Sequence, residues 1–281
     1  MKRPIEIQKQ LNQIGTIVNL TDVFASISSI RISRIKNQVL MSKDFFAELW
    51  GIYNQIRVGE DFNFGRGKKD KTLNKDLYIV ITSEGGFSGD IDQKLIKWML
   101  ESYDPKKQDI IVVGHHGVVE LAQKDIGIKR YFKMPLKDQN INVSPLIQEI
   151  IKYRSTTAWY QTYVSLMVQD IKKLNLRTAV KEQGQEVEKA KDIISEENYI
   201  FEPSTEDVVR HLERTMLQVA ISQIILESKL AQYASRFEAM SQASEKAKSH
   251  YSEVLLDFNR SKRNLQDEHL KEMMAGLRGA L

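Results

Sequence analysis

The chain has 281 residues, enough for one large domain or two ordinary ones, and the 42% that are hydrophobic can supply a buried core. A net charge of +4 is too small to indicate a nucleic-acid-binding protein, which usually concentrates basic residues on one face. The absence of cysteine excludes disulfides, thiolate metal ligands and thiol nucleophiles, and is typical of a reducing compartment. Neither a signal peptide nor an apolar run of about 18 residues is present, so we expect a soluble, cytoplasmic-type chain that reaches a membrane only through partners.

The first 58 residues are predicted to form one long helix. Its apolar stripe begins with Ile7, Leu11, Ile14 and Val18, at steps of four, three and four. After a change of phase near residues 16–18, the stripe continues through Leu20, Phe24, Ile27 and Ile30.

Residues 59–76 are polar and rich in Gly and Lys, which predicts a linker. Apolar runs at 77–82, 109–114 and 128–132 are then predicted strands, alternating with helices at 90–103 and 118–124. A helix at 143–153 and a pair of β-rich segments, 158–168 and 174–180, follow. This alternation indicates a Rossmann-like open α/β domain over residues 77–202.

The last helix is predicted over residues 203–281, with Ser204 or Thr205 as its N-cap. Its apolar positions repeat every 3.5 residues or so, which is the spacing of a coiled coil. The positions are Leu230, Tyr233, Phe237, Met240, Ser244, Ala247, Tyr251, Val254, Phe258, Ser261 and Leu265. We expect this helix to pair antiparallel with the N-terminal one, Ser244, Ala247 and Ser261 allowing close approach and Tyr251 and Phe258 holding the helices apart. The alternative is that both helices pack separately on a globular core.

The glycine-rich turn SEGGFSGD, Ser83 to Asp90, lies between a predicted strand and helix, where such turns can bind phosphate. It lacks the Gly-Lys-Ser/Thr ending of a P-loop and the G-x-G-x-x-G spacing, and Glu84, Asp90 and Asp92 would repel an anion. The pattern therefore favours a tight turn that packs helix against sheet.

His115 and His116 follow the second predicted strand, and neighbouring strand residues point to opposite faces, which disfavours joint metal binding. We predict no catalytic residue, no cofactor and no metal site. The basic cluster NRSKRN, 259–264, is either a solvated helix face or a contact for an acidic partner, and both interpretations stay open.

These motifs, taken in order, resemble the gamma subunit of F-type ATP synthases, the central rotor stalk. Leu11, Ile14, Leu20, Thr21 and Phe24 fit the family's I-x-x-I … I-T-x-A-M pattern. LYIVITSEGGFSG is similar to the family's strand and loop ending S-D-R-G-L-C/A-G-G, and YIFEPS to its Y-I-Y-E-P-S. ASRFEAMSQASEKA and NRSKRNLQDEHLKEMMAG are similar to A-S-R-M-x-A-M-x-x-A-T-x-N-A and N-K-A-R-Q-x-x-I-T-Q-E-L-T-E-I-V-x-G.

The resemblance implies a rotor, one copy per complex, whose coiled coil turns inside a ring of three alpha and three beta subunits. Its α/β domain would contact the epsilon subunit and the c-ring. Proton flow through the c-ring would drive ATP synthesis at the beta subunits, and hydrolysis would drive the reverse. The complex would be peripheral to the cytoplasmic side of a bacterial-type cell membrane.

Two sets of contact residues are carried over by the resemblance alone. The set that would face the beta subunits is Phe24, Arg236, Lys262, Arg263, Asp267, Glu268 and His269. The set that would form the foot on epsilon and the c-ring is Tyr199 and Glu202.

The sequence also departs from the family pattern. Asn19 and Asp22 stand where lysines are common, and Asp267, Glu268 and His269 replace T-Q-E. A specialised rotary ATPase therefore stays open as an alternative to a synthase. A third alternative, from another class, is a nucleotide-binding α/β protein with a helical dimerisation arm.

Overall fold

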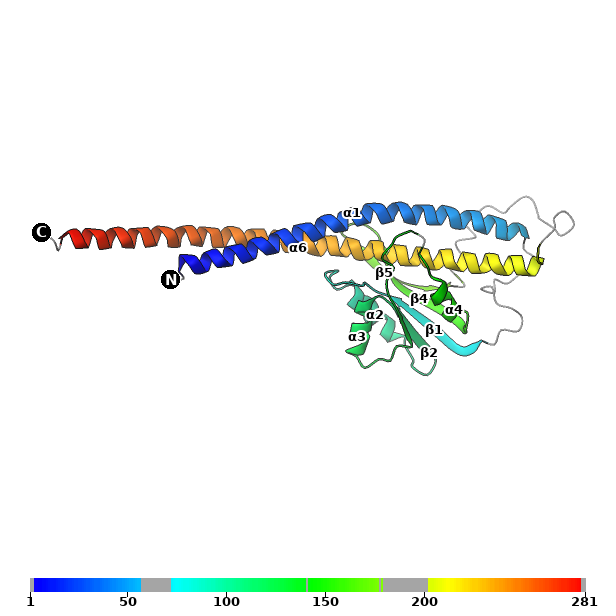
Figure 1. The fold of residues 1–281 in the computed structure, drawn as a ribbon. Coiled ribbons are helices and arrows are strands. Elements are labelled where there is room, and N and C mark those ends of the chain that lie inside the picture. The colour runs from blue at the N-terminus through cyan, green and yellow to red at the C-terminus, as the bar shows by residue number, and fades with distance from the viewer. Residues whose placement is uncertain (1–2, 57–71, 140, 177, 179–201, 279–281) are drawn as a thin grey trace. The chain divides into compact units, whose positions relative to one another are not determined.

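The computed structural model describes residues 3–56, 72–139, 141–176, 178 and 202–278 (Figure 1). Contacts divide the chain into two compact units, one made of Met1–Ser28 with Arg236–Leu281 and the other of Ser29–Ser235. Two long helices, α1 (Pro4–Ile56) and α6 (Thr205–Arg278), contribute residues to both units.

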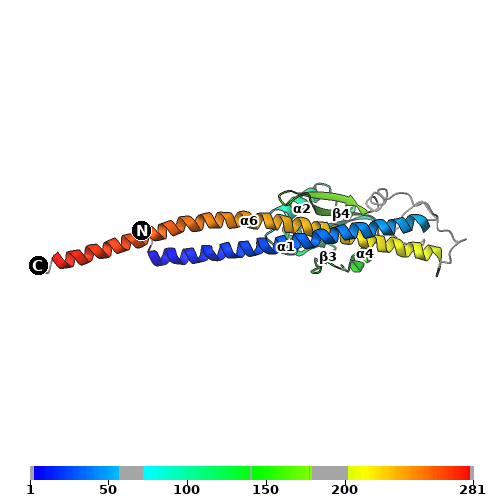
Figure 2. The same ribbon diagram turned by 90° about the horizontal axis from the view of Figure 1, so that it is seen from above.

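In the first unit, α1 and α6 form an antiparallel pair, as predicted. The carboxylate of Asp22 accepts a hydrogen bond from Ser244 Oγ at 2.6 Å, whereas Gly15, earlier in α1, lies against the ring of Tyr251, later in α6. A buried apolar cluster of Ile7, Leu11, Ile14 and Val254 continues this order. Both ribbon views show the two helices side by side (Figure 2).

The buried face of α1 has no change of phase, which corrects the sequence-based expectation. One continuous series of buried and half-buried positions follows alternating steps of four and three residues, with further buried or half-buried side chains such as Trp50 and Phe24 beside it. The series is Ile7, Leu11, Ile14, Val18, Thr21, Ala25, Ser28, Ile32, Ile35, Val39, Ser42, Phe46, Leu49, Tyr53 and Ile56. Leu20, Ile27 and Ile30 are exposed instead, because small residues occupy the contact positions between Val18 and Ile32.

On α6 the predicted contact positions are mostly correct. Met240, Ser244, Val254 and Ser261 are buried, as a coiled-coil contact requires. Leu265 is 55% exposed, and apart from the half-buried Asn264 the side chains from Lys262 to Ala275 are all exposed. The predicted contact face on α6 therefore extends one position too far. In the antiparallel pair the start of α1 faces the end of α6, and the first buried residue of α1 is Ile7, so the contact ends before Leu265.

The second unit contains a five-stranded sheet in the order β3-β2-β1-β4-β5. Its strands are β1 (Leu73–Ile81), β2 (Gln108–Val113), β3 (Arg130–Phe132), β4 (Tyr153–Tyr163) and β5 (Gln169–Asn175). The first four are parallel, in register pairs such as Ile79 with Ile111 and with Ala158. β5 is antiparallel to β4. The predicted open α/β sheet is confirmed.

Helices cover both faces of this sheet (Figure 1). One face packs on α2 (Ile91–Glu101) and α3 (His115–Ala122) through residues such as Val80 and Val112. The opposite face, including Ile79 and Ile111, packs on α1, α6 and α4 (Ser144–Ile150). Because successive strand residues point to opposite faces, continuous apolar strands are what a sheet buried on both sides needs.

Several predicted boundaries differ from those observed, among them the start of α3, at His115 instead of residue 118. β1 begins at Leu73, inside the predicted linker, and residues 57–71 of that linker lie outside the described residues. α4 ends at Ile150, so that β4 begins at Tyr153, five residues before the predicted strand. Val164–Val168, predicted as strand, form a hydrogen-bonded turn, and β5 consequently begins at Gln169.

Candidate functional site

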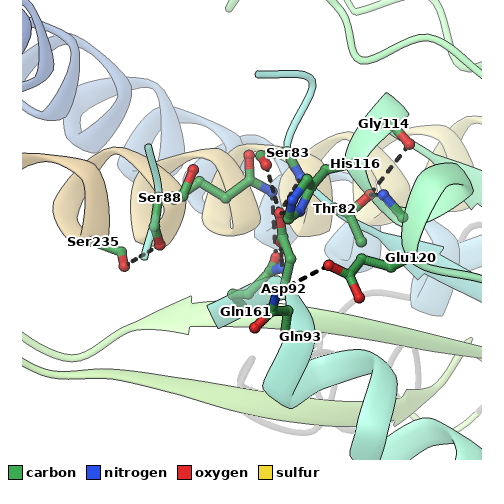
Figure 3. A network of polar contacts seen from close by, with 12 residues as sticks. Thr82, Ser83, Ser88, Asp92, Gln93, Gly114, His116, Glu120, Gln161 and Ser235 are labelled. Carbon is green, nitrogen blue, oxygen red and sulfur yellow. Dashed lines mark hydrogen bonds and ion pairs between the residues drawn. The ribbon is translucent and has the colours of Figure 1, made fainter. Parts of the chain in front are cut away.

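A buried polar network lies where β1 and β4 end, at the edge where the strand order of the sheet reverses (Figure 3). Asp92, only 1% exposed on the first turn of α2, is its centre. Asp92 Oδ2 accepts hydrogen bonds from Ser83 N at 3.1 Å and Ser83 Oγ at 2.5 Å, and lies 2.9 Å from His116 Nδ1. Open α/β sheets commonly bind ligands at this position, but here a carboxylate of the chain occupies the donors.

The other oxygen of Asp92 connects the network to α6. Gln161 Nε2, from β4, donates to Asp92 Oδ1 at 2.5 Å. The amide oxygen of Gln161 accepts hydrogen bonds from Ser228 Oγ at 2.5 Å and from Gln232 Nε2 at 3.3 Å. Ser228 and Gln232 are both buried on α6, so the network joins α2, β4 and α6 within this unit.

Two further polar side chains, Lys229 and Ser235, tie α6 to the sheet domain close to this network. Lys229 Nζ donates to the carbonyl oxygen of Pro135 at 2.9 Å and forms an ion pair with Asp138. Asp138 also pairs with Arg31 of α1, at 3.2 Å. Ser235 Oγ donates to the carbonyl oxygen of Ser88 at 2.6 Å.

The glycine-rich turn uses its polar groups for contacts inside the chain. Glu84, which was expected to repel a phosphate, accepts hydrogen bonds from Tyr131 Oη at 3.1 Å and from the backbone N–H of Met134 at 3.0 Å. Gly114 approaches the turn so closely, with φ of 102°, that an added Cβ would lie 2.0 Å from the carbonyl oxygen of Thr82. These contacts support the interpretation of a tight structural turn.

His116 has a role that the sequence did not indicate. It lies in the first turn of α3 rather than on a strand, so the strand argument about His115 and His116 was wrong. Its hydrogen bond to Asp92 raises the pKa of the imidazole, an effect that burial opposes and the charges of Asp92 and Glu120 reinforce. In the part of the chain that the structure describes, no group of three or more His, Asp or Glu side chains is placed to hold a metal ion.

The residues expected to face the beta subunits all belong to the coiled-coil unit but are not gathered into one site. Phe24 and Arg236 are half-buried. Lys262, Arg263, Asp267, Glu268 and His269 are exposed, and His269 Nδ1 lies 3.8 Å from Glu272 Oε2. Arg236 and His269 are about 50 Å apart along α6 at the usual rise of about 1.5 Å per residue. They form an extended surface rather than a pocket.

The structure describes only one of the two residues expected at the foot, Glu202. Glu202 is exposed just before α6, which begins at Thr205. Ser204 Oγ accepts a hydrogen bond from the backbone N–H of Asp207 at 3.2 Å, which confirms the predicted N-cap. Tyr199 lies outside the described residues.

Asp22, noted in the sequence only as a departure, connects the two helices of the coiled-coil unit. Its carboxylate accepts from Ser244 Oγ and pairs with Lys248 Nζ at 2.9 Å. The hydrogen bonds from Ser244 and Lys248 lower the pKa of the Asp22 carboxyl. None of the helices that the structure describes is both long and apolar enough to span a membrane.

Among the described residues, two long helices pair with each other in one unit and pack on a Rossmann-like sheet domain in the other. The family model described as ATP synthase matches residues 4–279, and the chain belongs to this family. The resemblance to the gamma subunit, the central rotor stalk, is confirmed.

Similar proteins extend over nearly the whole chain. The ATP synthase gamma chain of Cytophaga hutchinsonii is 22% identical, and that of Mesoplasma florum 23%, each alignment covering 96% of both chains. Among solved structures, a chain of the Euglena gracilis mitochondrial ATP synthase OSCP/F1/c-ring assembly has a TM-score of 0.62. It is 14% identical, and the match covers 98% of this chain and 94% of that one.

Proposed function

We propose that the chain is the rotor that couples rotation of a c-ring, driven by proton flow, to ATP synthesis or hydrolysis at the beta subunits of an alpha-three beta-three ring. The observation that carries the proposal is the antiparallel pairing of α1 and α6, with Asp22 bonded to Ser244 and Lys248 across the pair. Rotation of a shaft requires a stiff element, and two helices cross-linked along their contact resist bending and twisting more than one helix does. The chain itself contributes no catalytic residue in this proposal.

The proposed partners are the alpha and beta subunits around the coiled coil, and the epsilon subunit and c-ring at the foot. The proposed segments are 1–58 and 203–281 for the coiled coil and 77–202 for the α/β domain, to which β1 adds the last residues of the linker expected at 59–76, from Leu73 onward. The complex would be peripheral to the membrane, on the cytoplasmic side in a bacterial-type cell.

Reconstitution tests this function, because a ring of alpha and beta subunits with this chain, epsilon and the membrane sector should pump ions on addition of ATP. A ring that pumps equally well without the chain would refute it.

The exposed charges of α6 are proposed to bias the resting angle of the rotor. One exposed ion pair contributes only about 0 to 1 kcal/mol, so no single contact of Lys262 or Arg263 can hold the rotor. Several together can select an angle, and salt would weaken the selection. We expect Lys262→Ala with Arg263→Ala to assemble normally but to change the pauses of ATP-driven rotation and their salt dependence. A double variant that pauses as wild type at low salt would show that the cluster is only solvated.

Tyr199 and Glu202 are proposed to face the c-ring and epsilon. Since the chain has no cysteine, the Glu202→Cys variant would carry the only thiol of the subunit. Any cross-link formed by this subunit through a thiol would then come from position 202. Cross-links to c or epsilon are expected. Cross-links to beta instead would refute this placement.

A further inference from the structure

Four polar side chains on two successive turns of α6 are bonded to three separate segments of the sheet domain. They are Ser228, Lys229, Gln232 and Ser235, and we name them the anchor residues. Their partners lie at the end of β4, in the segment after β3 and in the glycine-rich turn after β1. Consecutive helix residues project about 100° apart, so the bonds of Ser228 and Lys229 hold α6 from two directions.

Most of the remaining contact is apolar, apart from a long hydrogen bond of 3.4 Å from Gln218 Nε2 of α6 to Ser144 Oγ of α4. Met216, Leu217, Ile221, Ile224 and Ile225 of α6 belong to the same buried cluster as the strand residues. Apolar burial is non-directional, so its free energy changes little when a helix rolls by a small angle over a flat surface. Hydrogen bonds weaken steeply when their angle is disturbed. The anchor residues, which make most of the polar bonds and the shorter ones, are therefore the main part of the contact that opposes rolling of α6.

We propose that the anchor residues and Gln161 fix the rotational position of α6 on the sheet domain and thereby transmit torque between them. This inference rests on the proposed function as a rotor. Gln161 is the positioning residue at the centre, because both ends of its amide are used. Its Nε2 group donates to Asp92, and its oxygen accepts from Ser228 and Gln232.

Asp92 provides the fixed point for Gln161. Its second oxygen is held by the backbone and side chain of Ser83 and lies beside His116 Nδ1 (Figure 3). A torque on α6 would thus pass through Gln161 into β1, α2 and α3 together, rather than into one loop.

The test uses the assembled complex in vesicles and measures the number of ions pumped per ATP hydrolysed. Gln161→Leu keeps the size of the side chain and removes all three hydrogen bonds. We expect hydrolysis within twofold of wild type and pumping per ATP at least fivefold lower. Ser228→Ala with Gln232→Leu removes the same connection from the α6 side and should give the same result. The matched control is Gln223→Leu, because Gln223 is also buried on α6 but, among the described residues, its side chain bonds only to Glu227 of the same helix.

A reversible disulfide distinguishes loss of the rotational position of α6 from general damage to the fold. A Cβ placed on Gly89 would lie 3.4 Å from Ser235 Oγ, which brings cysteines at these two positions within reach of a disulfide. Gly89 has a φ of 64°, so its replacement is strained, but the strain is present in the reduced and oxidised forms alike. In the Gln161→Leu background, oxidation of Gly89→Cys with Ser235→Cys should restore pumping per ATP at least threefold, and reduction should abolish the gain.

The outcomes distinguish the two proposals. If the complex with the wild-type chain does not pump, the proposed function is refuted. If it pumps, and both the Gln161→Leu and the Ser228→Ala with Gln232→Leu complexes pump equally well, the anchor proposal alone is refuted. The anchor proposal is also refuted if the variants lose coupling and the disulfide does not restore it, or if Gln223→Leu loses coupling to the same extent.

Discussion

Replacing Lys229 by Met tests how strongly the ion pair with Asp138 stabilises the sheet domain. The two side chains are only 5% and 11% exposed, so removal of the lysine leaves a largely buried carboxylate and the carbonyl oxygen of Pro135 without their donor. Breaking a buried pair from one side costs about 3–5 kcal/mol. Arg31 remains 3.2 Å from Asp138, although it is 39% exposed, and offsets part of the loss. We therefore expect about 3 kcal/mol, the lower end of that range.

Urea unfolding followed by tryptophan fluorescence measures this change, because Trp50, Trp98 and Trp159 all belong to the unit that contains Lys229. With an m-value of about 2 kcal/mol per molar urea, the midpoint should fall by about 1.5 M. Lys229→Met with Asp138→Leu leaves no buried charge unpaired, so the double variant should be more stable than Lys229→Met alone. A loss under about 1 kcal/mol for the single variant, or strict additivity in the double one, would refute the reasoning.

Three further changes test other parts of the structure. Leu11→Ala opens a gap in the buried cluster of the coiled-coil unit and should lower the free energy of unfolding by about 2–4 kcal/mol, measured as faster amide exchange in α1. The control is Ile17→Ala at an exposed position, which should cost about 0.5 kcal/mol or less. Burial raises the pKa of the Asp109 carboxyl, but hydrogen bonds from Lys75, Tyr153 and Lys129 outweigh burial and lower the pKa to about 2. The ionised carboxylate therefore stabilises the fold above about pH 4, and this stabilisation is lost as the pH falls toward 2. Asp109→Asn should abolish that part of the acid dependence of urea unfolding. The raised pKa of His116 gives the opposite pH dependence. The stabilisation from the protonated imidazole is complete below about pH 6.5 and is lost as the pH rises through the folded-state pKa. His116→Gln should therefore flatten the dependence of the unfolding free energy on pH in this range.

The sheet could be predicted from sequence because its strands are short apolar runs with clear boundaries. Ile79, Val80 and Ile81 are buried whichever face they point to, so the prediction needed no knowledge of the register. β5 was placed wrongly because its alternation is weak. Lys172 and Lys173 are both exposed, whereas the turn before it carries the apolar residues Leu166, Met167 and Val168.

The polar network could not be predicted, because its members are far apart in the sequence. Gln161 is 69 residues from Asp92 and 67 from Ser228, and no local pattern connects them. Asp92 was judged by its charge as a group that repels anions. Its actual role depends on the ends of β1 and β4 being neighbours in the sheet, which the strand order determines.

The contact face of α1 was predicted correctly from Ile7 to Val18 and wrongly after Val18, for a reason that bears on the proposed rotor. Thr21 and Ser28 are buried there, and each hydroxyl donates to a carbonyl oxygen of its own helix, at 2.9 Å to Ile17 and 2.8 Å to Phe24. Their burial is therefore inexpensive, since no polar group loses its partner. Small residues at the contact leave the large ones, Ile17, Leu20, Val23 and Ile27, exposed on the rest of the helix, and in residues 4–28 of α1 the only charged side chains are Glu6, Lys9 and Asp22.

An outer surface with few charges, on which exposed apolar residues alternate with uncharged polar ones such as Asn12 and Asn19, suits a part that turns against its surroundings. The free energy of an apolar contact depends mainly on the area buried and little on direction, so it changes gradually with the angle of rotation. Ion pairs depend on the distance between particular charges, and would favour particular angles. In the proposed rotor, α1 would then supply a surface that turns with little resistance, while the exposed charges of α6, Lys262 and Arg263 among them, would select the angles at which it rests.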